Sequence, residues 1–121
     1  MRWGTAAAIH HCSHRQAFGK LLAEQPLMQN VLADLVLESE GSLALTMRIA
    51  RALDRRAGDA HEELLARLGT PVGKYWICKR TPSHAYEAME CIGGSGVMED
   101  GPMPFDVKRM AYGGFRVFVD L

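Results

Sequence analysis

Three glycines lie within four residues, at Gly93, Gly94 and Gly96, directly after a helical pattern that ends near Ile92. Glycine has no Cβ and accepts positive φ, so another group can approach the backbone closely. The segment is not a dinucleotide-fold fingerprint, because that motif's third glycine is missing and a helix, not a strand, precedes it. A phosphate here would meet the backbone N–H groups of a helix-end loop. The alternative is that only the next turn of the chain approaches.

Two histidines, His10 and His14, are spaced i, i+4 and share one face of a predicted helix, a geometry that can hold a metal ion. No carboxylate or cysteine completes a ligand set in the same turn, so solvated or capping histidines are the favoured interpretation. Cysteines Cys12, Cys78 and Cys91 are far apart and form no C-x-x-C pair, which predicts reduced thiols. We therefore predict no metal site, and we assign no catalytic residue.

Arginines cluster near the end of the longest predicted helix, where they could pair phosphates bidentately. They are Arg48, Arg51, Arg55 and Arg56. Asp54 and Asp59 lie close to them in the sequence, which favours a solvated charged face, and the formal net charge of zero gives no global field for nucleic acid. DNA binding stays open as an alternative.

At 121 residues and 48% apolar content, the chain is long enough for one domain at most. No apolar run approaches the roughly 20 residues of a membrane span. The first residues lack the pattern of a signal peptide. These observations predict a cytoplasmic protein without a membrane partner.

The elements that position these residues are predicted to be helices. The first should cover 3–17 and stop at Gly19, and the longest should run from Pro26 to about 57. Asp59 is a predicted cap for the next helix. Thr-Pro pairs at 70–71 and 81–82 allow either new helix starts or a helix that continues with kinks. The fold class is all-α, an antiparallel helical bundle.

The composition changes after Pro104. Glycines at 113 and 114 separate β-branched and aromatic residues, which is a hairpin signal. We expect residues 1–104 to form the helical domain and residues 105–121 to form a divergent tail that is either a hairpin or disordered.

The order of residues resembles the C-terminal domain of acyl-CoA dehydrogenases. The run from Arg15 through Phe18 and Gly19 to Leu22, with Gln29 and Leu32-Ala33-Asp34, is similar to their R-x-x-F-G-x-x-L…Q-x-x-L-A-D motif. The run Ala88 to Gly96 is similar to A-x-Q-x-x-G-G-x-G. Glu90 in place of Gln, together with Gln25-Pro26 and Thr70-Pro71, resembles the adaptive-response (AidB-like) branch. The resemblance covers about residues 6–104.

This resemblance implies a helical bundle in a homo-oligomeric dimer of dimers, in contact with FAD. Arg15 would meet the FAD phosphates, Phe18 would pack on the cofactor, and Gln25 would lie near the flavin dinucleotide. Glu90 and the glycines Gly93 and Gly94 would hold the cofactor's far end. The family's flavin takes a hydride from CH–CH donors while a carboxylate takes the α-proton.

The family pattern stops at Met103-Pro104, before the Arg-Asp/Glu pair and the Glu-Gly-Ser/Thr that usually carries the catalytic base. Glu40-Gly41-Ser42 has those letters but lies mid-helix, so the role is not carried over. The break suggests a truncated or frameshifted reading frame. We expect a fragment that does not turn over acyl-CoA, and whose parent contacts acyl-CoA through missing domains. The alternative is a DNA-binding or oligomerisation module of an AidB-like protein.

Overall fold

The computed structural model describes residues 1–98, 100–103, 107–109 and 111, and these are mainly helical. The elements in chain order are α1 (Arg2–His14), β1 (Gln16–Ala17), β2 (Lys20–Leu21), the 3₁₀ turn η1 (Leu22–Glu24), α2 (Pro26–Arg55), α3 (Ala60–Glu90) and α4 (Gly94–Val97). The predicted all-α class is confirmed. None of the described helices is long and apolar enough to cross a membrane.

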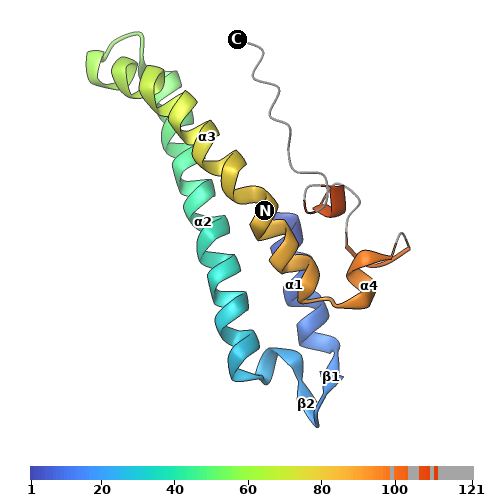
Figure 1. Ribbon diagram of the computed structural model, residues 1–121. Coiled ribbons are helices and arrows are strands. Elements are labelled where there is room, and N and C mark those ends of the chain that lie inside the picture. Colours follow the sequence, from blue (N-terminus) through green and yellow to red (C-terminus); the bar gives the residue numbers. More distant parts are fainter. Residues whose placement is uncertain (99, 104–106, 110, 112–121) are drawn as a thin grey trace.

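Helices α2 and α3 run antiparallel as a long helical hairpin, and α1 packs against both of them near the end that carries α4 (Figure 1). The core lies where the three helices meet. Ala8 and Cys12 come from α1, Leu35 comes from α2, and Ala88 and Met89 come from α3. The other end of the α2–α3 pair, beyond α1, is a two-helix arm (Figure 1).

Helix α3 continues through both prolines, which decides between the two predicted alternatives. A proline inside a helix costs about 3 kcal/mol, because it removes one N–H and crowds the preceding turn. The packing of α3 along α2 offsets this cost. Before each proline a threonine hydroxyl donates to the carbonyl four residues earlier, Thr70 to Ala66 and Thr81 to Ile77, each at 2.7 Å.

The first helix is shorter than predicted. It ends at His14, and Arg15 is extended with φ −84° and ψ 124°, so the predicted helix is wrong over residues 15–17. Strands β1 and β2 pair antiparallel, with Gln16 opposite Leu21 and Ala17 opposite Lys20. The two turn residues between them both have positive φ, which matches the right-handed twist of a two-residue hairpin.

The other helix starts agree with the sequence. Pro26 occupies the first turn of α2, and the Asp59 carboxylate accepts from the backbone N–H groups of His61 and Glu62 at 2.9 and 3.3 Å. The hairpin predicted around residues 113–114 lies outside the described residues. The described tail residues 107–109 and 111 are helical, and Val107 belongs to the core cluster. The division at residue 104 stays a prediction.

Candidate functional site

Phe18 lies at the tip of the β1–β2 hairpin and is almost fully solvent-exposed, at 96%. Its φ of 56° is in the left-handed region. For a residue with a bulky side chain this conformation costs about 1–2 kcal/mol relative to the right-handed region. An exposed aromatic side chain recovers none of this cost by packing within the described chain. Backbone strain of this kind clusters at binding and active sites.

Arg15 precedes the hairpin directly and its guanidinium is exposed. The Arg15 backbone closes the base of the hairpin, because its carbonyl accepts from Leu22 N at 2.9 Å while its N–H donates to His11 O at 2.9 Å. The side chain is left outside this network. Among the described residues no carboxylate forms an ion pair with Arg15. A fixed backbone thus carries a guanidinium that is available to an anion.

Gln25 links the hairpin to the start of α2. It is half-buried at the start of α2, and its side-chain amide Nε2 donates to the Ala17 carbonyl at 3.4 Å. Glu24 adds a second contact, because its carboxylate accepts from Leu21 N at 3.3 Å. The structure therefore brings together Arg15, Phe18 and Gln25, with the amide of Gln25 turned toward the hairpin.

The remaining predicted residues gather at the end of α3. Glu90 is the last residue of this helix and is exposed, as are Gly93 and Gly94. Gly93 has φ 69°, which favours glycine. A Cβ on Gly96 would lie 2.7 Å from the Met89 carbonyl oxygen, so internal packing explains that glycine. A Cβ on Gly94 would meet nothing within 4 Å, so the described chain does not account for this one.

The hairpin and α4 both lie at the end of the molecule opposite the α2–α3 turn (Figure 1). Contacts between α1 and the end of α3 hold them there, and one is the Cys12 thiol, which donates to the Cys91 carbonyl at 3.8 Å. Burial raises the pKa of the Cys91 thiol to about 11. Arg15 lines a cleft of about 440 Å³ between α1 and Pro102, which follows the glycine loop. Gly93 and Gly94 do not line this cleft.

Sequence reasoning missed a buried polar junction in the bundle. The buried His84 joins all three long helices, since its Nε2 lies 3.1 Å from Leu35 O and 3.2 Å from Thr5 Oγ1. Burial lowers the pKa of His84, with a further lowering from the nearby chain N-terminus, against raising by its hydrogen bond to Leu35 and by Glu38. No sequence motif marks this junction, because its residues are far apart in the chain.

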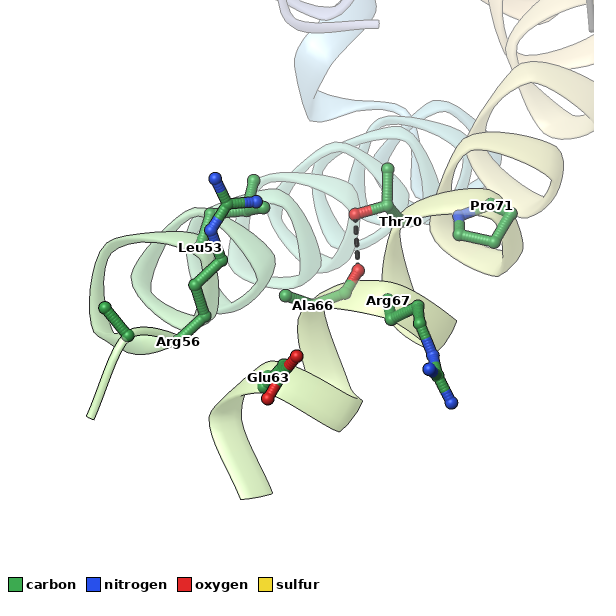
Figure 2. A pocket seen from close by; sticks show the side chains of 8 residues that line it. Leu53, Arg56, Glu63, Ala66, Arg67, Thr70 and Pro71 are labelled. Atoms are coloured by element: carbon green, nitrogen blue, oxygen red, sulfur yellow. Dashed lines mark hydrogen bonds between the residues drawn. The ribbon is translucent and has the colours of Figure 1, made fainter. Parts of the chain in front are cut away.

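The arginine cluster is divided by the fold. Arg48 pairs bidentately with Glu62, at 2.8 and 3.0 Å, so it faces α3 and not a phosphate. A second groove of about 710 Å³ lies near the α2–α3 turn, and Figure 2 shows Arg56 and Arg67 reaching out on either side of it with Glu63 between. The lining of this groove therefore contains two guanidinium groups and one carboxylate.

The hairpin and glycine loop suit one kind of ligand. A guanidinium favours a phosphate, an exposed aromatic ring favours a planar apolar group, and an unhindered glycine backbone allows close approach. Together, these residue types can bind a ligand that combines a phosphate with a planar ring. Within the described residues no three potential ligands from His, Cys, Asp and Glu gather closely enough to hold a metal ion.

Comparison with known proteins gives consistent matches. Residues 1–113 match the family described as acyl-CoA dehydrogenase, C-terminal domain. The chain is 49% identical over 110 residues to the putative acyl-CoA dehydrogenase AidB of Escherichia coli, a match that covers 91% of this chain and 20% of that protein. It is 34% identical over 107 residues to acyl-CoA dehydrogenase family member 11 of Caenorhabditis elegans, covering 86% of this chain and 17% of that protein. The chain thus spans about a fifth of these relatives' length.

Proposed function

We propose, since this chain belongs to the acyl-CoA dehydrogenase family as its C-terminal domain, that it forms one wall of an FAD site in an acyl-CoA-oxidising oligomer. The resemblance to the AidB-like branch agrees with the Escherichia coli relative. In this proposal Arg15 and Phe18 hold the phosphate and ring portions of the cofactor. Gly93 and Gly94, with Glu90 ahead of them, receive the cofactor's far end.

The conformation of the β1–β2 hairpin is the main observation that supports this proposal. Its tip keeps an aromatic residue at φ 56° and 96% exposure, although glycine or asparagine would adopt that backbone at lower cost. Gln25 and Glu24 fix the hairpin against α2, so Phe18 and Arg15 are presented on a rigid support. Such preorganisation reduces the entropy lost when a ligand binds.

The chemical work of these residues is binding and orientation. FAD, when bound, would accept a hydride from a CH–CH donor. Arg15 would neutralise phosphate charge, and Phe18 would exclude water from one cofactor face. Since no catalytic base is assigned among these residues, we propose that these 121 residues do not oxidise acyl-CoA alone. Dye reduction by the purified chain with FAD and an acyl-CoA would contradict this.

The flavin contact can be tested in a chimera in which this chain replaces the matching segment of the Escherichia coli relative. Arg15→Gln and Phe18→Ala should each weaken flavin retention about tenfold, which corresponds to about 1.4 kcal/mol. Flavin absorbance per protein after gel filtration gives the readout. Arg51→Gln and Tyr75→Ala, two exposed residues on the arm, are matched controls and should retain flavin. Equal retention in all four variants would contradict the proposal.

A second candidate function is DNA binding by the arm. It is supported by the groove of Figure 2, whose walls carry Arg56 and Arg67, and by the nearby exposed Arg51 and Arg55. Affinity for duplex DNA should fall steeply with salt and should be lost in Arg51→Glu with Arg55→Glu. Absence of binding at low salt would remove this candidate.

Self-assembly is supported by an exposed apolar stripe. Leu64, Leu68 and Val72 are spaced four residues apart on α3 and all are exposed. A monomeric domain rarely leaves such a continuous apolar face in water. We propose that this stripe meets another subunit or domain of the same homo-oligomer.

A further inference from the structure

His84 lies in α3 at the place where all three long helices meet, and only 4% of it is exposed. Its Nε2 lies 3.1 Å from the Leu35 carbonyl oxygen on α2 and 3.2 Å from the Thr5 hydroxyl oxygen on α1. A single imidazole nitrogen therefore joins α1, the helix that leads into the β1–β2 hairpin, to the α2–α3 pair.

The hydrogen bonds assign the proton of the neutral His84 ring to Nε2. A carbonyl oxygen can only accept, so Nε2 must donate to Leu35. The Thr5 hydroxyl donates to the Met1 carbonyl at 3.4 Å, and its oxygen can therefore accept from the same Nε2–H. The lone pair of the ring is then on Nδ1. This atom is buried and has no hydrogen-bond partner among the described residues.

Protonation of His84 would occur at Nδ1 and would disturb this junction in two ways. The new N–H would be a buried donor with no acceptor in the described part of the chain, and an unsatisfied buried donor is costly. The ring would also carry a positive charge away from water. The Leu35 carbonyl accepts from Nε2 in both protonation states, so it does not compensate the new N–H. Once α1 has separated, water can accept from both N–H groups.

The titratable and charged groups around His84 come from all three helices. They are the Met1 amino group on α1, Asp34 and Glu38 on α2, and Lys79, Arg80 and Glu87 on α3. This set contains as many cationic groups as carboxylates. Glu38 favours the charged ring, but its carboxylate is already paired with Arg80. Burial is therefore the dominant influence, and it lowers the pKa of His84 from its ordinary value of 6.5.

We propose that His84 is an acid-sensitive contact that holds α1, and with it the β1–β2 hairpin, against the α2–α3 pair. While the ring is neutral, its one N–H group is satisfied and the three helices stay together. When the ring takes up a proton, the bundle shifts toward states in which α1 is separated from α3. Arg15 directly follows α1, so acid should also loosen any ligand that the hairpin holds. Only this last consequence rests on the proposed function.

The direction of the pH dependence follows from the two states. The separated state binds the proton more readily, because its imidazole has the ordinary pKa of 6.5, whereas the pKa in the closed bundle is lower. The stability that this contact contributes is therefore complete above about pH 6.5 and is lost as the pH falls below that value. The equilibrium constant for opening should rise about three- to tenfold between about pH 7 and pH 5.5.

Hydrogen exchange of the α1 amides, followed by mass spectrometry on the 121-residue chain, tests the proposal. Each rate is divided by the intrinsic rate of an unstructured peptide at the same pH, so that the ratio reports opening alone. The protection of residues 6–14 should fall about three- to tenfold from about pH 7 to pH 5.5. Protection that does not change over this range would overturn the proposal.

His84→Gln separates this residue from the other titrating groups. The glutamine amide can still donate to the Leu35 carbonyl, but it takes up no proton in this range. Whatever its protection at pH 7, the variant should lose less than about twofold on acidification. His61→Gln, an exposed position at the start of α3, is the matched control and should retain the pH dependence of the parent chain. Equal pH dependence in His84→Gln and the parent chain would overturn the proposal.

An NMR titration of the parent chain gives an answer even if His84→Gln does not fold. The midpoint of the His84 imidazole C–H signal in the folded chain should lie below the midpoint of the same signal in urea. A folded midpoint equal to or above the unfolded one would overturn the proposal. None of these measurements uses flavin, so their failure would reject this contact alone. Flavin retention that ignores Arg15 and Phe18 would reject the proposed function alone.

Discussion

Phe18 has a backbone conformation that is unfavourable for its side chain, and its ring is exposed. A single substitution at this position therefore changes both properties. Asn-Gly is the preferred pair for a two-residue hairpin turn with positive φ. Phe18→Asn should therefore raise the free energy of unfolding of the 121-residue chain by about 1 kcal/mol, as measured by urea denaturation. The same substitution should weaken flavin retention in the chimera. A less stable variant would show that the ring packs within the chain.

Gly94 and Gly96 lie in the same short helix, and the structure predicts opposite results for them. Gly94→Ala should change the free energy of unfolding by less than about 0.5 kcal/mol, because its Cβ meets open space. Gly96→Ala should cost about 1–3 kcal/mol, because its Cβ would lie 2.7 Å from a backbone carbonyl.

Thermal or urea unfolding of the two variants measures this difference. If Gly94 serves a ligand, Gly94→Ala should also lower flavin retention in the chimera while stability stays unchanged. Similar losses of stability in both variants would mean that the loop packs against the chain at both positions.

The sequence selects these candidate residues through motif letters and not through geometry. The letters around Phe18 and Gly93 selected the two segments. They could not show that Phe18 has positive φ, because that depends on a register set by the pairing of Ala17 with Lys20. Nor could they separate Gly94 from Gly96, since a close approach to Met89 exists only after the chain turns back on α3.

Helices α2 and α3 are joined by two ion pairs between their facing sides. Arg48 pairs with Glu62 near the turn, and Arg80 pairs bidentately with Glu38 further along, with the Arg80 Nη2 to Glu38 Oε2 distance at 2.8 Å. In each pair the hydrogen-bonded guanidinium lowers the pKa of the carboxyl group from its ordinary value near 4.5. The Arg80 guanidinium also stacks on Trp76, 4.8 Å from the ring centroid.

This arrangement gives a pH dependence with a definite sign. A carboxyl whose pKa is lower in the folded than in the unfolded state stabilises the fold above the unfolded value and loses this effect as the pH falls through the folded value. Glu62→Gln should therefore lower the melting temperature at pH 6, and its difference from wild type should shrink as the pH falls below about 4.5. Glu63→Gln, on the same turn without a described ion pair, is the control. A constant difference across this range would contradict the assignment.

Among the elements, the helices were predictable because their apolar spacing and caps are local signals. Pro26 and Asp59 marked helix starts correctly. The hairpin at 16–21 was missed, since alanine-rich sequence favours helix and only tertiary support from Gln25 and Glu24 holds two short strands. The passage of α3 through Pro71 and Pro82 was left undecided, because the outcome depends on packing against α2.

The whole molecule has its three-helix core at one end and exposes apolar side chains along the arm. Leu68 is 57% exposed in the middle of the α3 stripe. The 121-residue chain should therefore self-associate at micromolar concentration, and Leu68→Glu should shift it to monomer by placing a charge in an apolar contact. Sedimentation velocity measures this. Leu27→Glu, 77% exposed at the start of α2, should leave the association intact. A wild-type monomer at high concentration would contradict the prediction.

Cys12 and Cys91 are both buried where α1 contacts the end of α3, and there the Cys12 thiol donates to the Cys91 backbone carbonyl. Burial raises the pKa of both, so little thiolate is present at neutral pH while the contact is closed. Cys78, which is half-buried on α3, should react first with iodoacetamide. In a Cys78→Ala chain the remaining alkylation can proceed only when α1 separates from α3. The alkylation rate of Cys12 and Cys91 therefore reports how often α1, the helix that leads into the hairpin, separates from α3.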